Sequence, residues 1–175
     1  EVDDKPVAKV IDFGIAKALE RPLTDKTLFT EFRQFIGTPE YMSPEQAELS
    51  LIDVDTRSDV YALGVMLYEL LAGKPPFDPK SLRSVGFDEM RRIIREEEPP
   101  PPSSKLTRSG SGQNGDVPDP ELAKLGKLVR GELDWIVQRA MAKERDRRYA
   151  SANDLEEDLS RYLRNEPVRA GRPGR

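Results

Sequence analysis

The sequence predicts a mainly α-helical domain that begins with a short β-hairpin. Three segments carry apolar residues at the three- and four-residue spacing of amphipathic helices: 60–71, 131–141 and 151–163. A shorter apolar run, 7–11, follows a polar, turn-forming segment and has the length of a strand. The chain has 175 residues, which is enough for a domain with a hydrophobic core, since domains of about 100 to 150 residues are the commonest.

Composition excludes several kinds of chemistry. The sequence contains no cysteine and no histidine, so disulfides, thiolate catalysis, zinc sites built on these residues and a serine-histidine-aspartate triad are ruled out. A net charge of -4 favours no nucleic-acid partner. The apolar stretch 60–72 is too short to cross a bilayer and no secretion signal leads the chain, so we expect no membrane segment and a cytoplasmic location.

The hairpin is expected to end at Asp12-Phe13-Gly14. A carboxylate at a strand end offers a hard oxygen ligand suited to Mg²⁺, Phe13 would pack inward, and Gly14 would permit a sharp turn. Three residues alone also fit an ordinary strand end with a turn glycine. The polar stretch that follows, up to Gly37, predicts a mobile loop with threonines spaced three apart at Thr24, Thr27 and Thr30.

Three further motifs follow in order. They are Gly37-Thr38-Pro39-Glu40-Tyr41-Met42-Ser43-Pro44-Glu45, Asp59-Val60-Tyr61-Ala62-Leu63-Gly64 and Arg147-Arg148-Tyr149. Together with Asp12-Phe13-Gly14 they resemble the serine/threonine protein kinases of bacteria, from about Val7 to Leu163. The resemblance implies the C-terminal helical lobe of the protein kinase fold, which is α+β as a whole, as a partial kinase domain over 1–164.

The resemblance also implies a role for each motif residue. Asp12 would bind Mg²⁺, and Asp12, Phe13 and Gly14 would lie at the ATP site. The stretch 14–45 would be the activation segment, with Thr24, Thr27 and Thr30 as candidate phosphorylation sites. Gly37, Thr38 and Pro39 would contact a protein substrate. Glu45 would form a buried ion pair with Arg148, and Asp59 would accept backbone N–H groups of the catalytic loop.

The remaining elements are predicted from local patterns. Pro44 favours a short helix to Ala47, and Ser58-Asp59 offers a cap for the helix over 60–71. Gly73 followed by prolines should end that helix, and Phe77 should return to the core. A calcium loop formed by Asp53, Asp55 and Asp59 is a weak alternative, because the glycine and closing glutamate of such loops are missing.

The C-terminal half predicts more helices and two irregular segments. Helices are expected over 87–95, 120–128, from 131 and over 151–163, with the turn 143–149 keeping Arg148 in register. The proline run Pro99 to Pro102 and the Ser/Gly-rich stretch after it predict a flexible insert over about 97–119, with a proline-motif ligand as the alternative. Five arginines and one acid between Arg161 and Arg175 predict a basic linker over 165–175.

Much of the family's catalytic apparatus is missing from these residues. No His-Arg-Asp string, glycine-rich loop or lysine strand is present, so no catalytic residue is assigned and the segment alone is expected to be inactive. It would need the N-terminal lobe and the catalytic loop as partners. The alternative hypothesis is a pseudokinase or truncated helical module that binds a partner; Asp12 favours the catalytic reading, because a scaffold needs no magnesium ligand there.

Overall fold

The computed structural model describes residues 39–48, 54–110 and 119–171. The chain divides into two units, Glu1–Gly37 and Thr38–Arg175, and every described residue belongs to the second. No strand occurs among the described residues, which are mainly helical as predicted. The predicted hairpin and the stretch before Pro39 lie outside them.

The described part begins with two short helical turns and a long helix. The 3₁₀ turn η2 spans Pro39–Tyr41, α2 spans Pro44–Ala47, and α3 spans Thr56–Ala72. The predicted cap at Ser58-Asp59 is wrong, because Asp55 caps α3 by accepting from the Arg57 backbone N–H at 2.8 Å, which starts the helix earlier. Gly73 ends α3 in the left-handed conformation, φ +71°, that side chains other than glycine rarely adopt.

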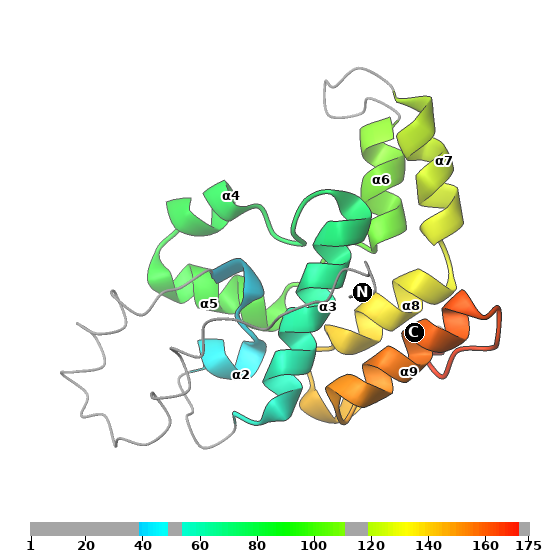
Figure 1. Ribbon diagram of the computed structural model, residues 1–175. Coiled ribbons are helices and arrows are strands. Elements are labelled where there is room, and N and C mark those ends of the chain that lie inside the picture. The colour runs from blue at the N-terminus through cyan, green and yellow to red at the C-terminus, as the bar shows by residue number, and fades with distance from the viewer. Residues whose placement is uncertain (1–38, 49–53, 111–118, 172–175) are drawn as a thin grey trace, which may run out of the picture. The chain divides into compact units, whose positions relative to one another are not determined.

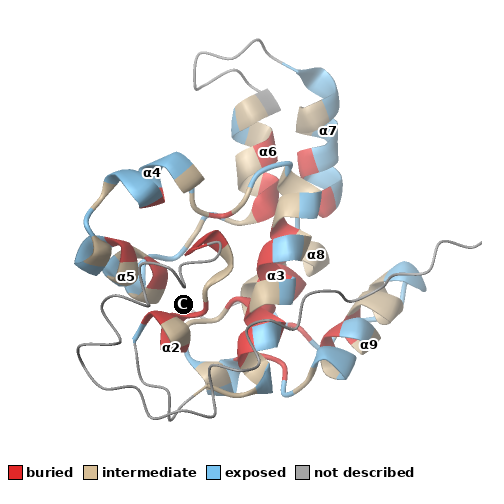
Figure 2. Cartoon of the chain, turned by 60° about the vertical axis from the view of Figure 1, so that its left-hand side comes forward, coloured by how far each residue is buried: buried red, intermediate tan, exposed pale blue. Residues whose placement is uncertain are grey.

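Shorter helices complete the lobe around α3 (Figure 1). They are α4 (Pro79–Ser84), α5 (Phe87–Glu96), α6 (Pro102–Gly110), α7 (Pro120–Val129), α8 (Glu132–Ala140), the 3₁₀ turn η3 (Arg145–Arg147) and α9 (Ala152–Leu163). In the views of Figures 1 and 2, α2, α4 and α5 lie on one side of α3 and α8 and α9 on the other. The helices predicted over 44–47, 87–95, 120–128, 131–141 and 151–163 are confirmed to within two residues at their described ends.

Three clusters of buried side chains form the core. In the first, Val60 of α3 packs with Ile136 and Ala140 of α8 and with Leu155 of α9. In the second, the other buried face of α3, including Tyr61 and Tyr68, meets α8. The third cluster lies under α2, α4 and α5, and the half-buried Phe77 packs against it as predicted. The central helix α3 therefore contributes to two of the three clusters, and Figure 2 shows buried residues along its length.

The flexible insert predicted over 97–119 is wrong for its first half. Residues 102–110 form α6, in which Pro102, Ser103 and Leu106 are buried. The Ser103 backbone N–H and hydroxyl both donate to the buried Asp134 carboxylate of α8, at 3.0 and 2.6 Å. A side chain distant in sequence thus caps this helix, and the local composition carries no sign of it.

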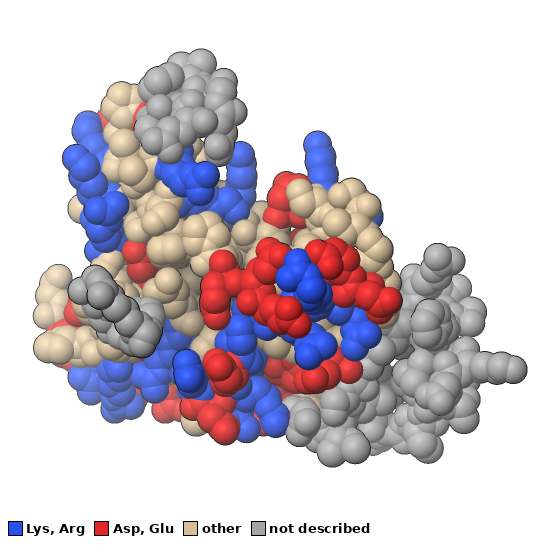
Figure 3. Space-filling model, turned by 180° about the vertical axis from the view of Figure 1, so that it is seen from behind, with Lys and Arg blue, Asp and Glu red and all other residues tan. Residues whose placement is uncertain are grey.

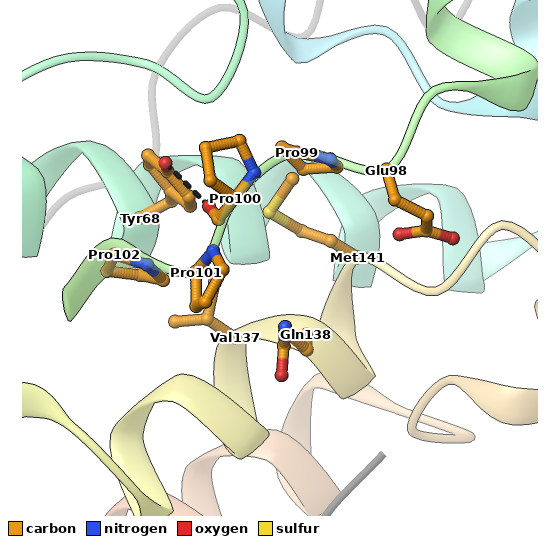
Figure 4. A pocket seen from close by; sticks show the side chains of 9 residues that line it. All are labelled: Tyr68, Glu98, Pro99, Pro100, Pro101, Pro102, Val137, Gln138 and Met141. Atoms are coloured by element: carbon orange, nitrogen blue, oxygen red, sulfur yellow. Dashed lines mark hydrogen bonds between the residues drawn. The ribbon is translucent and has the colours of Figure 1, made fainter. Parts of the chain in front are cut away.

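The proline run packs within the same lobe. Tyr68 of α3 donates its hydroxyl hydrogen to the Pro100 carbonyl at 2.8 Å, and Val137 and Met141 lie beside the prolines (Figure 4). Pro99 and Pro101 are half-buried, whereas Pro100 is exposed and held by its carbonyl. Pro102 begins α6, and the flexibility of residues 99–101 stays a prediction.

The basic linker predicted over 165–175 is bound to α9 where the structure describes it, and its role as a linker stays a prediction. The backbone N–H groups of Arg169 and Ala170 donate to the fully buried Asp158 of α9, at 2.6 and 2.8 Å, and Ala170 is itself buried. Asp158 also accepts the Tyr149 hydroxyl at 2.8 Å. One buried carboxylate with three donors holds the chain against α9. Leu163, predicted as part of the apolar stripe of α9, is 78% exposed.

Candidate functional site

Of the residues predicted to bind nucleotide, metal or substrate, only Pro39 is described, and its side chain is buried at the start of η2. The others lie outside the described residues: Asp12, Phe13, Gly14, Gly37, Thr38 and the threonines Thr24, Thr27 and Thr30. The described site is consequently the segment from Pro39 to Glu48, which follows the predicted substrate loop, together with the groups that hold it.

One hydrogen bond and one ion pair fix the start of this segment. The Tyr41 hydroxyl donates to the Glu69 carboxylate on α3. This hydrogen bond, with partial burial, raises the pKa of Tyr41 to about 12, so the phenol stays protonated at neutral pH. Glu40 is 4% exposed and accepts from Arg83 of α4 at 3.1 Å. Its second oxygen, Oε2, is buried with no hydrogen-bond partner among the described residues.

The short helix α2 begins with a capping box. The Ser43 backbone N–H donates to the Gln46 side chain at 2.9 Å, and the Gln46 backbone N–H donates to the Ser43 hydroxyl at 3.4 Å. Pro44 occupies the first helical position, where a missing N–H costs nothing. These local signals place Glu45 in the first turn of α2 and direct its carboxylate into the lobe.

Glu45 and Arg148, which the family resemblance pairs, form a buried two-pronged ion pair. Arg148 Nη1 and Nη2 donate to Glu45 Oε1 and Oε2, each at 2.7 Å. The two residues are 103 positions apart in the sequence. Ser58 of α3 adds a third donor, its hydroxyl lying 2.5 Å from Glu45 Oε1. The pair joins the segment after the predicted substrate loop to α3 and to the turn before α9.

Every N–H of the Arg148 guanidinium has an acceptor. Besides the Glu45 carboxylate, it donates to the carbonyls of Arg57 at 3.0 Å, Ala142 at 2.7 Å and Lys143 at 3.1 Å. Its charge also lies over the ring of Tyr61, 5.1 Å from the centroid. A lysine could not fill this position, because it lacks the planar set of five donors.

The electrostatics favour the ionised pair. Burial raises the pKa of Glu45, but the hydrogen bonds from Arg148 and Ser58 outweigh it and hold the pKa below its ordinary value. Glu45 is therefore a carboxylate at neutral pH. Both charges are buried and hydrogen-bonded, so removing either side chain would leave the other charge unpaired in the interior.

A second charge cluster supports the same turn. Arg57 donates to Asp55 at 2.7 Å and to Asp146 at 2.7 Å, and Arg145 lies 3.5 Å from Asp55. The carboxylate of Asp55 is occupied as a helix cap and by these arginines. No group of three or more acidic side chains among the described residues could hold a metal ion, and Asp53 of the calcium alternative lies outside them.

Asp59, predicted to accept catalytic-loop N–H groups, is exposed in the first turn of α3. That role stays a prediction. Sequence reasoning named Ser58 only as a helix cap and missed its hydrogen bond to Glu45. It did not single out Glu69 or Lys143 for the site. Lys143 donates to the Ile94 carbonyl at 2.6 Å, and burial lowers its pKa to about 8. Neither Glu69 nor Lys143 carries a sequence signal for these contacts, because each has its partner far along the chain.

One face of α3 carries apolar side chains that the described lobe leaves uncovered. Leu63, Met66 and Leu70 are 38%, 56% and 81% exposed, and they follow the spacing of one helical face. Beside them lies an open hollow of about 470 Å³ lined by Tyr41, Met66, Leu67, Glu69 and Leu70. The hollow thus adjoins the Tyr41–Glu69 contact of the candidate site.

These features together define the C-terminal helical lobe of a protein kinase fold. A family model described as the protein kinase domain matches residues 2–158. The chain belongs to the protein kinase family, in its bacterial serine/threonine branch. No helix among the described residues is long and apolar enough to cross a membrane.

Curated proteins similar to this chain support the same family assignment. The chain is 38% identical to serine/threonine-protein kinase PknB of Mycobacterium leprae and of Mycobacterium tuberculosis, over 93% of its length and 21% of theirs. It is 33% identical to the probable serine/threonine-protein kinase PknB of Bifidobacterium longum, over 93% of its length and 19% of that protein. The chain therefore spans about a fifth of the length of these relatives.

Proposed function

We propose that this chain is part of a serine/threonine protein kinase that transfers the γ-phosphate of ATP to hydroxyl groups of protein substrates in the cytoplasm. The observation that carries the proposal is the Glu45–Arg148 pair. It ties the segment following Gly37-Thr38-Pro39 to α3 and to the turn before α9, which would hold a substrate-binding loop in place. Phosphoryl transfer depends on such positioning, because little covalent chemistry falls to the protein.

In this proposal Asp12 holds Mg²⁺. A carboxylate is the ligand type that this ion prefers, and Mg²⁺ bound there would offset the charge of the ATP phosphates. Asp12 lies within the matched stretch of the family model. Thr24, Thr27 and Thr30 are the proposed sites at which phosphorylation would order the activation segment. A phosphate adds about 1.5 to 2 negative charges, which arginines can bind.

These 175 residues alone are expected to be inactive. They contain no His-Arg-Asp string and no glycine-rich loop. Titration of the isolated chain with Mg²⁺-ATP in a calorimeter should show no binding at micromolar concentrations. Micromolar binding would contradict the proposal that the nucleotide site needs the N-terminal lobe and the catalytic loop.

A non-catalytic partner-binding module is the second candidate. The uncovered apolar face of α3, Leu63, Met66 and Leu70, favours it, since isolated proteins seldom leave such faces in water. The intact mass and N-terminal sequence of the protein made in its own cells separate the two. A longer chain with a lysine strand and a catalytic-loop aspartate supports the kinase, whereas a native start at Glu1 supports the module.

A further inference from the structure

Helices α6 and α7 form an antiparallel pair that rises from the rest of the lobe (Figure 1). Their contact is close at Gly126. A Cβ at this position would lie 2.7 Å from Thr107 Oγ1 and 3.0 Å from the Ser103 carbonyl oxygen. Gly126 thus faces α6, and both Gly126 and Val129 are buried. The opposite face of α7 is therefore turned to solvent.

The surface of this pair has the opposite charge to the chain as a whole. The described residues 102–110 and 119–130 carry the bases Lys105, Arg108, Lys124, Lys127 and Arg130 and the acids Asp119 and Glu121. The full chain has a net charge of -4. Figure 3 shows the Lys and Arg side chains gathered over α6 and α7, at the upper left. Lys124 pairs with Glu121 at 2.7 Å, but both side chains are mostly exposed, so the pair is weak.

Two leucines lie among these bases. Leu128 is 74% exposed and Leu125 is 41% exposed, and they are three residues apart on α7. Lys124 stands one helical turn before Leu128, and Lys127 directly precedes Leu128 in the sequence. Both leucines are exposed, whereas the close contact with α6 is made at the buried Gly126. An apolar centre with a charged rim is the arrangement found at protein interfaces.

We propose that the exposed face of α7, formed by Lys124, Leu125, Lys127 and Leu128, binds an acidic, leucine-containing segment of another protein. The leucines would contact apolar side chains of that segment, and the lysines would pair with its carboxylates. The local positive charge in an acidic chain would also steer an acidic partner to this face and away from the rest of the surface. The proposal does not depend on catalytic activity.

Two other classes of partner fit less well. A helix that lies in a membrane surface presents a broad apolar face, whereas Val129 of α7 is buried and only two leucines of this helix are exposed. Binding of single-stranded nucleic acid relies on aromatic side chains for stacking, and neither 102–110 nor 119–130 contains one. An acidic protein segment is the ligand that both the charge and the leucines match.

The test is fluorescence anisotropy of the 175-residue chain with a labelled acidic peptide. The probe has about 15 residues, with leucines three and four apart and glutamates between them. Binding should weaken about tenfold in Lys124→Glu/Lys127→Glu, and it should fall between about 50 and about 200 mM salt. Leu125→Ser/Leu128→Ser should weaken it as well. The matched control Lys74→Glu/Lys80→Glu, which reverses two exposed lysines elsewhere, should bind as the unchanged chain does.

Reversing the charges of both the α7 face and the peptide shows whether weaker binding comes from lost charge attraction or from unfolding of the variant. The Lys124→Glu/Lys127→Glu variant should gain affinity for the same peptide with lysine in place of glutamate. The proposal is overturned if the acidic peptide does not bind, if the control variant weakens binding as much, or if no charge exchange occurs. Stronger binding to anionic phosphatidylglycerol vesicles than to the peptide would also overturn it and would assign the face to a membrane surface.

Discussion

At the scale of single residues, Arg148 connects more of the lobe than any motif predicts. Its guanidinium bonds Glu45 of α2, the carbonyl of Arg57 in α3 and two carbonyls that follow α8. The pairing of Arg148 with Glu45 could be predicted from the family resemblance, because each residue lies in one of the motifs that carry it. The three carbonyl contacts could not, since backbone acceptors leave no trace in the sequence.

Replacing Arg148 with alanine should destabilise the lobe by about 3 to 5 kcal/mol, because Glu45 would stay buried without its partner. Urea unfolding followed by circular dichroism, at low protein concentration, measures the change. The control is Arg147→Ala, which removes a pair with Glu144 at 3.7 Å whose side chains are 75% and 63% exposed. It should change stability by less than about 0.5 kcal/mol.

The same measurement has a second arm. Glu45→Met/Arg148→Met removes both charges and should recover part of the loss, since no unpaired charge remains. Equal stability of Arg148→Ala and Arg147→Ala would show that the buried pair does not hold the lobe together.

The lowered pKa of Glu45 also predicts a pH dependence. A carboxyl group whose pKa is lower in the folded state stabilises the fold above its unfolded value, ordinarily 4.5, and this contribution is lost as the pH falls through the lower folded pKa. As the pH is lowered from about 4.5 through the folded pKa of Glu45, the free energy of unfolding should therefore fall more steeply in the unchanged chain than in Glu45→Gln. Other carboxylates titrate equally in both proteins, so parallel curves would contradict the assignment.

At the scale of elements, the α6–α7 pair depends on one glycine. Gly126→Ala adds a Cβ that clashes with Thr107 and with the Ser103 carbonyl, which should cost about 1 to 3 kcal/mol, less about 1 kcal/mol gained in helix propensity. Amide hydrogen exchange in α6 should accelerate. Gly171→Ala is the control, because its Cβ would meet nothing within 4 Å. Unchanged exchange in α6 would mean that the two helices do not pack as closely as described.

Sequence patterns predicted elements well where a helix buries its own apolar face. The helix α5 follows from Met90, Ile93 and Ile94, two of which are buried as expected. Sequence patterns failed where contacts between elements distant in the sequence determine the structure. The helix α6 has little apolar content and relies on Asp134 of another helix, and the segment after α9 is held by the buried Asp158. The sequence around Asp134 and Asp158 gives no sign that these two carboxylates are buried.

At the scale of the whole molecule, the uncovered face of α3 is the largest departure from a self-sufficient fold. Burial of apolar surface contributes about 25 cal/mol per Å², so Leu63, Met66 and Leu70 would gain from any cover. The sequence predicted an apolar helix over 60–71. It could not say which side chains remain exposed, because that depends on the neighbours present.

The isolated chain should therefore self-associate through α3. Sedimentation velocity should show oligomers whose amount rises with concentration, and Met66→Gln/Leu70→Gln should shift the chain toward monomer. Leu163→Gln is the matched control, since Leu163 is 78% exposed on α9, away from this face. A monomer with a cooperative unfolding transition at all concentrations would refute the expectation.

The central claim is that the chain belongs to an active serine/threonine kinase in which Asp12 binds the metal of Mg²⁺-ATP. The most direct measurement is phosphoryl transfer from labelled ATP to a serine- or threonine-containing protein by the native protein, compared with its Asp12→Asn variant. The account predicts transfer by the unchanged protein and at least a hundredfold loss in the variant, because about 2.7 kcal/mol of transition-state stabilisation already corresponds to that factor. Absence of transfer by the native protein, or equal rates for both forms, would contradict it.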